Sequence, residues 1–412
     1  MRIGWVSEAL PYLPSRGGFR LYGANLIKGL SAKHEVHLVS LLQENDVEHL
    51  DWPRGYCASI DTIPASEVSL LHRAANFISG YVYGKPLNHR GPFNDLLRSC
   101  LNSQKWDVMH VEGSFAGGLV EANLPVAKVL STHDAEALRA QEMLRCDLPY
   151  HEKFRYAVRR YYEPRFERLV YPRYERCIVV AERDLKFNQE LVPNARFDLV
   201  PYGTDTEYFY PVPVEKQPAT LAFHSHLGYP PNIGAATEFA DEILPLIRRE
   251  RPDVVFHLVG ASPDPKITAL AERPGIRLSS NLPDLRPAVC SAGIYVCAIR
   301  YGTGLKSKVL EAMAMRMPIV AYHPGSTVGI ECVHGEHLLA AETPQEFAAC
   351  VLQLLQHPDQ AAKLAENARR LVEEKYSWAS RVSVYEDLYT QVINERAKRT
   401  QVAVAARWPL PR

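Results

Sequence analysis

Residues 298–315 read Ala-Ile-Arg-Tyr-Gly-Thr-Gly-Leu-Lys-Ser-Lys-Val-Leu-Glu-Ala-Met-Ala-Met, and this stretch decides the fold class. It follows an apolar run at Gly293–Cys297 that predicts a buried strand, and it continues into a helix expected over Lys306–Met315. The apolar positions that predict the buried stripe of this helix are Leu305, Val309, Ala312 and Met313. A buried strand, a glycine loop and a helix in this order form one unit of a parallel sheet covered by helices.

The loop inside this stretch has the composition of a phosphate-binding turn. Gly302 and Gly304 let backbone N–H groups come close to a ligand, and the following helix presents unpaired N–H groups at the positive end of its dipole. Arg300 and Lys306 add positive charge beside the loop. We therefore interpret these four residues as candidates for binding a phosphate group.

Glu311 lies on a different face of the predicted helix from the buried stripe. Its carboxylate can therefore point toward a ligand and accept hydrogen bonds from both hydroxyls of a ribose. An ordinary strand-to-helix turn with a surface pair of Lys308 and Glu311 explains the same residues. Because a short Gly-x-Gly signal is weak, the residues by themselves leave both interpretations open.

The alternation of short apolar runs and helical segments extends in both directions from this stretch, which is typical of the α/β class with doubly wound parallel sheets. In the first half we predict strands at Arg2–Ser7, Glu35–Leu42, Asp107–Val111, Ala127–Ser131, Cys177–Val180 and Phe197–Val200, and a helix at Leu21–Ala32. In the second half we predict strands at Thr220–Phe223, Val254–Val259, Ile276–Leu278, Gly293–Cys297 and Ile319–Ala321, and a helix at Ile233–Glu250.

The proline-rich segment 211–219 has no periodicity and marks the boundary between two domains, at 1–210 and 220–376. The pattern then becomes purely helical, and residues 397–412 are expected to form a disordered tail. The helices predicted in this last part are Gln345–Gln356, Asp359–Tyr376 and Ser377–Arg396. Two such domains imply a cleft where the carboxyl ends of their strands face each other.

Composition narrows the class of protein. With 412 residues the chain is longer than one hydrophobic core normally serves, so two domains of about 200 residues are expected. Its 47 basic and 47 acidic residues cancel, which gives no electrostatic basis for binding nucleic acid. The eight cysteines include no C-x-x-C pair, so neither a zinc site nor a disulfide framework is predicted. Because no signal-peptide core or membrane-spanning run is visible, we expect a cytoplasmic protein.

Two loops of the first half carry further candidates. Gly17 and Gly18 join the first strand to the first helix, where they either reach a phosphate or sugar or simply form a tight turn. No full G-x-G-x-x-G is present, so a nicotinamide cofactor is not favoured. His133 follows a buried strand at the edge expected to face the cleft. A histidine in such a loop acts on a ligand or only satisfies local hydrogen bonds, and both readings stay open.

Taken together, these segments resemble the retaining glycosyltransferases of family 4, the group 1 family. The resemblance runs over nearly the whole chain. The segments that carry it are Gly17-Gly18, Thr132-His133-Asp134-Ala135-Glu136, Val200-Pro201-Tyr202-Gly203-Thr204-Asp205, Gly228-Tyr229-Pro230-Pro231-Asn232, the stretch 298–315 and Tyr376-Ser377-Trp378. It implies the GT-B fold, in which two Rossmann-like domains face each other and the last helix, here about 377–396, crosses back to the first domain.

The resemblance also implies roles for residues. Glu311 would bind the donor ribose, Arg300 and Lys306 the diphosphate, and His133 the donor sugar. The remaining donor-binding candidates are Gly17, Gly18, His226, Gly302, Thr303 and Gly304, and those on the acceptor side are Asp134 and Glu136. Thr303 stands eight residues before Glu311, where the family usually has a second carboxylate, so a contact made by that carboxylate is in doubt.

The implied activity is transfer of a sugar from a nucleotide-diphosphate sugar to a saccharide, a lipid-linked glycan or a small hydroxylated acceptor, with no metal and no other cofactor. Thr303 keeps a second function open, a binding protein or partner subunit that holds a nucleotide sugar without turnover. An epimerase would need a cluster of carboxylates around the sugar, and the sequence shows none. The basic, tyrosine-rich segment 151–176 fits either a peripheral contact with an anionic membrane or a solvated helix face.

Overall fold

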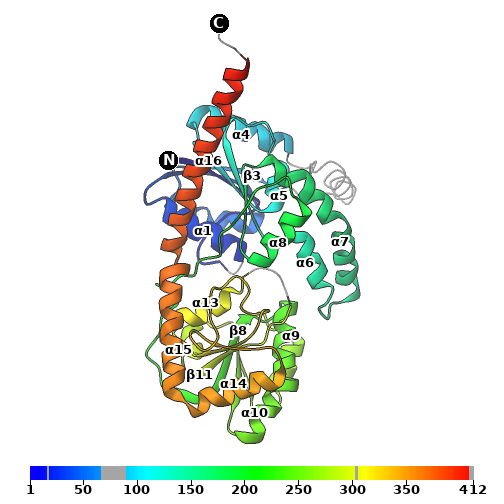
Figure 1. The fold of residues 1–412 in the computed structure, drawn as a ribbon, viewed down its shortest axis with the longest axis vertical. Helices are drawn as coiled ribbons and strands as arrows, with labels where there is room; N and C mark the ends of the chain where they lie inside the picture. The colour runs from blue at the N-terminus through cyan, green and yellow to red at the C-terminus, as the bar shows by residue number, and fades with distance from the viewer. Residues whose placement is uncertain (16–17, 66–89, 302–304, 408–412) are drawn as a thin grey trace. The chain divides into compact units, whose positions relative to one another are not determined.

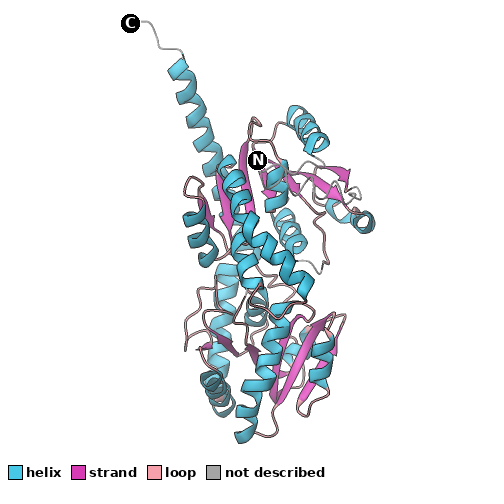
Figure 2. Cartoon of the chain, turned by 90° about the vertical axis from the view of Figure 1, so that its right-hand side faces the viewer, coloured by secondary structure: helices cyan, strands magenta, loops and turns pink. Residues whose placement is uncertain are grey.

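The computed structural model describes residues 1–15, 18–65, 90–301 and 305–407, which divide into two compact units (Figure 1). The first unit consists of Met1–Leu138, Val158–Val200 and the chain from Arg381 onward. The second consists of Arg139–Ala157 and Pro201–Ser380. Each unit has its own parallel sheet with helices along its faces (Figure 2).

The sheet of the first unit has the order β3-β2-β1-β4-β5-β6-β7 in the described residues, and each neighbouring pair is parallel. Its strands are β1 (Arg2–Ser7), β2 (Glu35–Leu42), β3 (Ser59–Pro64), β4 (Val108–Glu112), β5 (Ala127–His133), β6 (Arg176–Val179) and β7 (Phe197–Leu199). The central strands are buried along nearly their whole length, which is why they read as continuous apolar runs in the sequence.

The sheet of the second unit has the order β10-β9-β8-β11-β12-β13 in the described residues, again with parallel neighbours. Its strands are β8 (Gln217–His226), β9 (Val255–Ala261), β10 (Ile276–Ser280), β11 (Ala292–Cys297), β12 (Ile319–Tyr322) and β13 (Leu339–Ala341). In both sheets the order reverses beside the first strand of the unit, which is the doubly wound topology predicted from the sequence.

Two strands, β3 and β13, were missed by the sequence pattern. Both are at the edge of a sheet, and neither has a long apolar run. The sequence of β3, Ser-Ile-Asp-Thr-Ile-Pro, mixes polar and apolar residues and is only half-buried, and β13 has three residues. A search for continuous apolar runs therefore passes over them. Strand β8 also begins at Gln217, inside the segment 211–219 predicted as a linker.

The helices cover the sheets and supply the loops at their edges. In the described residues they are α1 (Gly18–Leu30), η1 (Glu44–His49), α2 (Asp51–Arg54), α4 (Arg90–Gln104), α5 (Ser114–Leu119), α6 (Glu136–Met143), α7 (Tyr150–Val170), η2 (Tyr171–Arg173), α8 (Glu182–Leu191), α9 (Pro230–Glu238), η3 (Phe239–Ile243), α10 (Leu244–Glu250), α11 (Pro265–Ala271), α12 (Arg286–Cys290), α13 (Ser307–Ala314), α14 (Pro344–Gln356), α15 (Pro358–Leu371), η4 (Val372–Tyr376) and α16 (Trp378–Arg407). A search of the described helices for one that could span a bilayer finds none.

Three helical predictions differ from the structure. The segment predicted as one helix at Asp359–Tyr376 is α15 followed by the π-helical turn η4. The segment predicted as one helix at Ile233–Glu250 is α9 and α10 joined by the π-helical turn η3, because Pro245 lacks the N–H needed to continue a regular ladder. Helix α16 runs to Arg407, so the disordered tail expected from residue 397 is wrong for 397–407. Residues 408–412 are outside the described residues.

The last helix, α16, packs on the first unit, as the resemblance implied. Tyr385 places its hydroxyl against the hydroxyl of Tyr22 on α1, and both side chains are buried. Farther along, Glu395 pairs with Arg176 at the start of β6, with Oε1 2.6 Å from Nη2. The chain enters the second unit at Arg139 and again at Pro201, and it returns to the first unit at Val158 and at Arg381.

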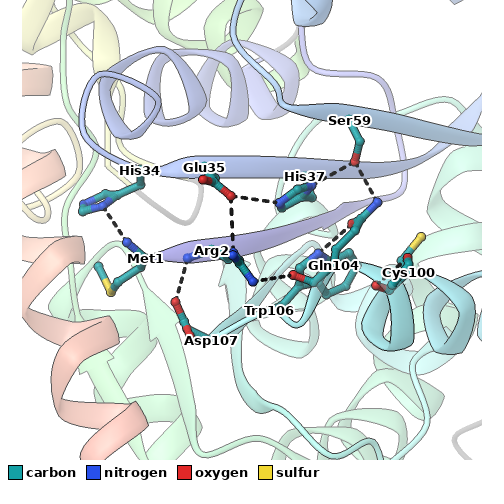
Figure 3. Close-up of polar contacts among 11 residues, drawn as sticks. Met1, Arg2, His34, Glu35, His37, Ser59, Cys100, Gln104, Trp106 and Asp107 are labelled. Atoms are coloured by element: carbon teal, nitrogen blue, oxygen red, sulfur yellow. Dashed lines mark hydrogen bonds and ion pairs between the residues drawn. The ribbon is translucent and has the colours of Figure 1, made fainter.

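The amino end of the first sheet is packed around Trp106 (Figure 3). The Trp106 indole N–H donates to Gln104 Oε1 at 2.8 Å, and the Gln104 amide donates to Ser59 Oγ at 3.1 Å. Ser59 in turn lies 3.0 Å from His37 Nδ1 on β2. The ring is thereby held against the backbone of Gly4 in β1, where a β-carbon would overlap three of its atoms.

Gly4→Ala is therefore expected to lower the free energy of unfolding of the first unit by about 1–3 kcal/mol, because the anchored ring of Trp106 must move. Urea unfolding followed by tryptophan fluorescence measures the change. Gly91→Ala is the matched control, since nothing lies within 4 Å of the added methyl group on α4. Equal stability of the two variants would show that Trp106 shifts at no cost.

Candidate functional site

His133 ends β5 and is the centre of a polar cluster in the first unit. The residue is 7% exposed, and its φ of 63° lies in the left-handed region, which is strained for a side chain of this kind. The register between β5 and β6 also shifts between Ser131 and His133. This irregular strand end turns the imidazole toward the neighbouring strand β4.

The imidazole of His133 lies against the carboxylate of Glu112, the last residue of β4. Glu112 Oε1 lies 2.6 Å from His133 Nε2, and Glu112 Oε2 lies 2.9 Å from Nε2 of His110. The other ring nitrogen of His110 lies 2.8 Å from the Tyr389 hydroxyl on α16. A buried polar chain thus runs from α16 through β4 to the end of β5, and it holds the carboxylate between two imidazoles.

The charges in this chain follow from competing effects. Burial alone would lower the pKa of His133, but the charge and hydrogen bond of Glu112, together with the charges of Asp134 and Glu8, outweigh burial, so the pKa of His133 is raised. Burial alone would raise the pKa of Glu112, but the two histidines lower it. Burial also lowers the pKa of His110, which Glu112 only partly offsets. These shifts favour a positive charge on His133, a negative charge on Glu112 and a neutral imidazole at His110.

Glu8 and two aromatic rings complete the surroundings of His133. The rings of Tyr22 and Phe19 lie 4.8 and 5.2 Å from the imidazole, centre to centre, where they can stabilise its positive charge. Glu8, just beyond β1, accepts a hydrogen bond from the Ala116 N–H at 3.3 Å, and burial raises its pKa to about 7. Glu8 and Phe19 both approach Gly113, whose φ of 95° and lack of a β-carbon permit the contact.

The two candidates that follow His133 have different surroundings. Asp134 is half-buried, and its charge favours the protonated form of His133. Glu136, in the first turn of α6, has Oε2 2.6 Å from Nη2 of Arg159. Arg159 also donates from Nε to Glu163 at 3.0 Å. Arg159 therefore balances much of the negative charge on the loop after β5.

In the second unit, Glu311 on α13 pairs with a histidine that the sequence analysis did not single out. Glu311 Oε2 lies 2.7 Å from Nε2 of His224 on β8, and the two side chains are 21% and 3% exposed. Burial alone would raise the pKa of Glu311, but the hydrogen bond from His224 lowers it. The carboxylate is thus ionised, fixed in position by one oxygen and still partly exposed, as a group that binds sugar hydroxyls must be.

Two cationic candidates lie on either side of the glycine loop. Arg300 donates from Nε to Glu238 at 2.5 Å and from Nη1 to the Glu342 carbonyl at 2.9 Å. Its guanidinium also lies 3.8 Å from the ring centre of Tyr322. Lys306 is the N-cap residue of α13 and is 7% exposed. Arg300 is therefore held by Glu238 of α9, Tyr322 of β12 and the Glu342 carbonyl, and Lys306 stands directly before α13.

The remaining predicted residues are not assembled into either cluster. His226 is exposed at the end of β8, where its carbonyl accepts a hydrogen bond from Asn232 at 2.8 Å. Gly18 is the first residue of α1, and nothing lies within 4 Å of a β-carbon added there. The candidates that lie outside the described residues are Gly17, Gly302, Thr303 and Gly304.

The sequence analysis missed four polar residues of these clusters. They are Glu8, His110, Glu112 and His224, which lie within or just after the buried strands β1, β4 and β8. A polar residue at the carboxyl end of an apolar run was the signal for Glu8 and Glu112, because such ends meet at one edge of a parallel sheet. For His110 and His224, inside their strands, no local signal exists.

Two family models match this chain, one in its first half and one in its second half. A family model described as Glycosyltransferase Family 4 matches residues 16–208, and one described as Glycosyl transferases group 1 matches residues 218–357. A protein of Xenopus tropicalis, Glycosyltransferase 1 domain-containing protein 1, is 29% identical over 147 residues. These residues are 34% of this chain and 42% of the relative, so the match spans less than half of the relative's length.

Two solved structures superpose on most of this chain. A sucrose-phosphate synthase from Thermosynechococcus elongatus superposes with a TM-score of 0.67 and 17% identity, over 96% of this chain and 99% of the other. HepE from Anabaena, solved in complex with UDP, gives a TM-score of 0.65 and 12% identity, over 95% of this chain and 100% of the other. At these identities the similarity establishes the fold.

Proposed function

The chain belongs to the group 1 glycosyltransferases of family 4 and has their GT-B fold, and from this premise we propose that it transfers a sugar from a nucleotide-diphosphate sugar with retention of configuration. The acceptor is a saccharide, a lipid-linked glycan or a small hydroxylated molecule, and the product belongs to glycan biosynthesis. The observation that carries the proposal is Glu311, an ionised and partly exposed carboxylate held by His224 inside the segment matched by the group 1 model.

In the proposed donor site, Glu311 accepts hydrogen bonds from the ribose hydroxyls while Arg300 and Lys306 neutralise the diphosphate. Lys306 stands directly before α13 and Arg300 is held in place by Glu238, and in this proposal both cations stabilise the charge that builds on the leaving group, a task that requires no metal. Backbone N–H groups of the glycine loop add to this stabilisation.

The transfer itself needs no protein nucleophile in this proposal. The bond from the anomeric carbon to the diphosphate breaks, the acceptor oxygen bonds to the same face of the sugar, and the leaving diphosphate takes the acceptor proton. His133, whose imidazolium is favoured by Glu112, supports the donor sugar and the departing negative charge. Asp134 and Glu136 are proposed to orient the acceptor. We place the reaction in the cytoplasm, with a peripheral contact to a membrane that carries the acceptor.

Nucleotide binding tests the donor site directly. The melting temperature of the protein is measured with UDP, GDP, ADP, dTDP and their sugar conjugates, for wild type and for Glu311→Ala. A nucleotide at 100 times its dissociation constant should stabilise the wild type by about 2.7 kcal/mol, and Glu311→Ala should remove that gain. Glu272→Ala, which removes an exposed carboxylate on the same unit, should keep it.

If no nucleotide raises the melting temperature of the wild type, the donor site is wrongly assigned.

Once a nucleotide that binds is found, analysis of the reaction products separates the possible activities. Sugar transferred to an acceptor supports the proposed enzyme, an isomerised donor indicates an epimerase, and an unchanged donor that still binds indicates the non-catalytic protein.

A further inference from the structure

Helix α7 exposes three large aromatic side chains along one line. Tyr150 is 87% exposed, Phe154 is 66% exposed and Tyr161 is 90% exposed. At 100° per residue, their spacing of four and seven residues keeps all three within about 40° of one another around the helix axis. Figure 1 shows α7 as one continuous helix, so the three rings form a stripe along its outer face. Exposed rings in such a row mark an interaction surface.

The basic and acidic residues of α7 differ in how far they are exposed. The basic residues of α7 at exposed positions are Lys153, Arg155, Arg160, Arg165 and Arg168. By helical spacing, Lys153 and Arg160 fall on one side of the aromatic stripe and Arg165 on the other.

The acidic residues are turned inward or paired. Glu163 is 8% exposed and Glu167 is fully buried, while Glu152 lies 3.6 Å from Arg155. The outer face of α7 is therefore aromatic and positively charged. Because the whole chain has equal numbers of basic and acidic residues, this positive charge is a local property of the helix.

We infer that the outer face of α7 docks on the surface of an anionic lipid bilayer. Tyrosine and phenylalanine rings are stable at the level of the lipid headgroups, where one part of the ring is apolar and the phenol hydroxyl stays hydrated. Lysine and arginine beside them meet the lipid phosphates. An exposed helix face suits a flat surface, whereas a peptide or a nucleic acid strand is normally bound in a groove.

This inference deepens the proposed function. It rests on that function only for the explanation of why the protein would bind a membrane. Docking through α7 would favour the lipid-linked acceptor among the three acceptor classes, because it brings the protein to the surface where such a glycan is anchored. The contact itself needs neither donor nor transfer, so it can be measured separately.

The test is co-sedimentation of the full chain with vesicles of phosphatidylcholine alone or mixed equally with phosphatidylglycerol, at low and high salt. Wild type should bind the anionic vesicles about tenfold more tightly than the neutral ones, and high salt should weaken the binding. The double variant Lys153→Glu and Arg160→Glu, and the triple variant with serine at 150, 154 and 161, should each lose about tenfold or more.

The matched control is the double variant Lys363→Glu and Arg370→Glu, which reverses two exposed cations on α15 and should bind like wild type. Nucleotide-dependent melting of the same proteins shows whether they are folded, and it reports on the donor site independently. Absence of vesicle binding by wild type, or equal binding by all variants, overturns the inference. Self-association lost in the serine variant, seen by sedimentation velocity, also overturns it in favour of a second copy of the chain.

Discussion

Glu112→Gln is expected to lower kcat/KM for sugar transfer about a hundredfold at neutral pH, because it removes the charge that keeps His133 protonated. In the wild type, Glu112 is the largest of the influences that raise the pKa of His133 against burial. With a neutral glutamine, burial is left to lower that pKa, and the imidazolium is lost at a lower pH. Activity in the variant should therefore survive only toward acid pH.

The pH dependence of kcat/KM separates this effect from a simple loss of structure. If the imidazolium is the active form, the alkaline limb of the profile follows the pKa of His133 and moves to lower pH in Glu112→Gln. Tyr389→Phe is the control, since it removes the hydroxyl 2.8 Å from His110 but keeps the carboxylate beside His133. A Glu112→Gln profile that coincides with that of wild type would mean that the charge of His133 plays no part in the reaction.

Glu167→Gln is expected to change the dependence of stability on pH more than any other substitution in the first unit. Glu167 on α7 is fully buried, and burial raises its pKa from 4.5 to about 8. Its Oε1 accepts hydrogen bonds from the Ala137 N–H and the Tyr171 hydroxyl, both at 3.2 Å. Among the described residues Oε2 is buried with no hydrogen-bond partner, so ionisation there is costly.

The direction in which stability changes with pH follows from the pKa of the Glu167 carboxyl group in the folded and in the unfolded chain. Its pKa is higher in the folded chain than in the unfolded chain, so the stability contributed by the protonated form is complete below pH 4.5. That stability is lost as the pH rises toward 8. Glutamine stays neutral throughout. Relative to wild type, Glu167→Gln should therefore gain about 4–5 kcal/mol of unfolding free energy between pH 4 and pH 9.

Urea unfolding at a series of pH values measures this gain, and taking the difference from wild type cancels the titration of the other groups. Glu190→Gln removes an exposed carboxylate on α8 and should follow the wild-type curve. Parallel curves for wild type and Glu167→Gln would show that the buried carboxyl group does not carry its proton to neutral pH in the folded chain.

The strands were predicted well wherever their burial is complete. The bounds of β1 and β2 are those expected from the apolar runs at Arg2–Ser7 and Glu35–Leu42, and the buried stripe of α13 is confirmed. A strand covered on both faces is mostly apolar, so its sequence reports its structure locally. Strand β3 is only half-buried and β13 has three residues, so neither forms a long apolar run in the sequence.

The candidate sites were predicted in part. The sequence pointed to His133 and Glu311 because each stands at a strand end or helix start in a recognisable segment. The sequence did not point to Glu112, which pairs with His133, or to His224, which pairs with Glu311. The partners are distant along the chain, since His224 and Glu311 are separated by 87 residues and meet only because β8 lies beside β11, whose loop leads into α13. No local periodicity encodes that contact.

By itself, then, the amino-acid sequence determined the α/β class, the two-part organisation and the family, because buried strands, amphipathic helices and glycine turns each impose a local pattern on the chain. Only the tertiary structure decided which charges are paired, which side of α7 faces solvent, and how far the pKa of Glu167 rises. These properties depend on burial and on neighbours supplied by other strands and helices, and a charge is stabilised or neutralised by what surrounds it in space.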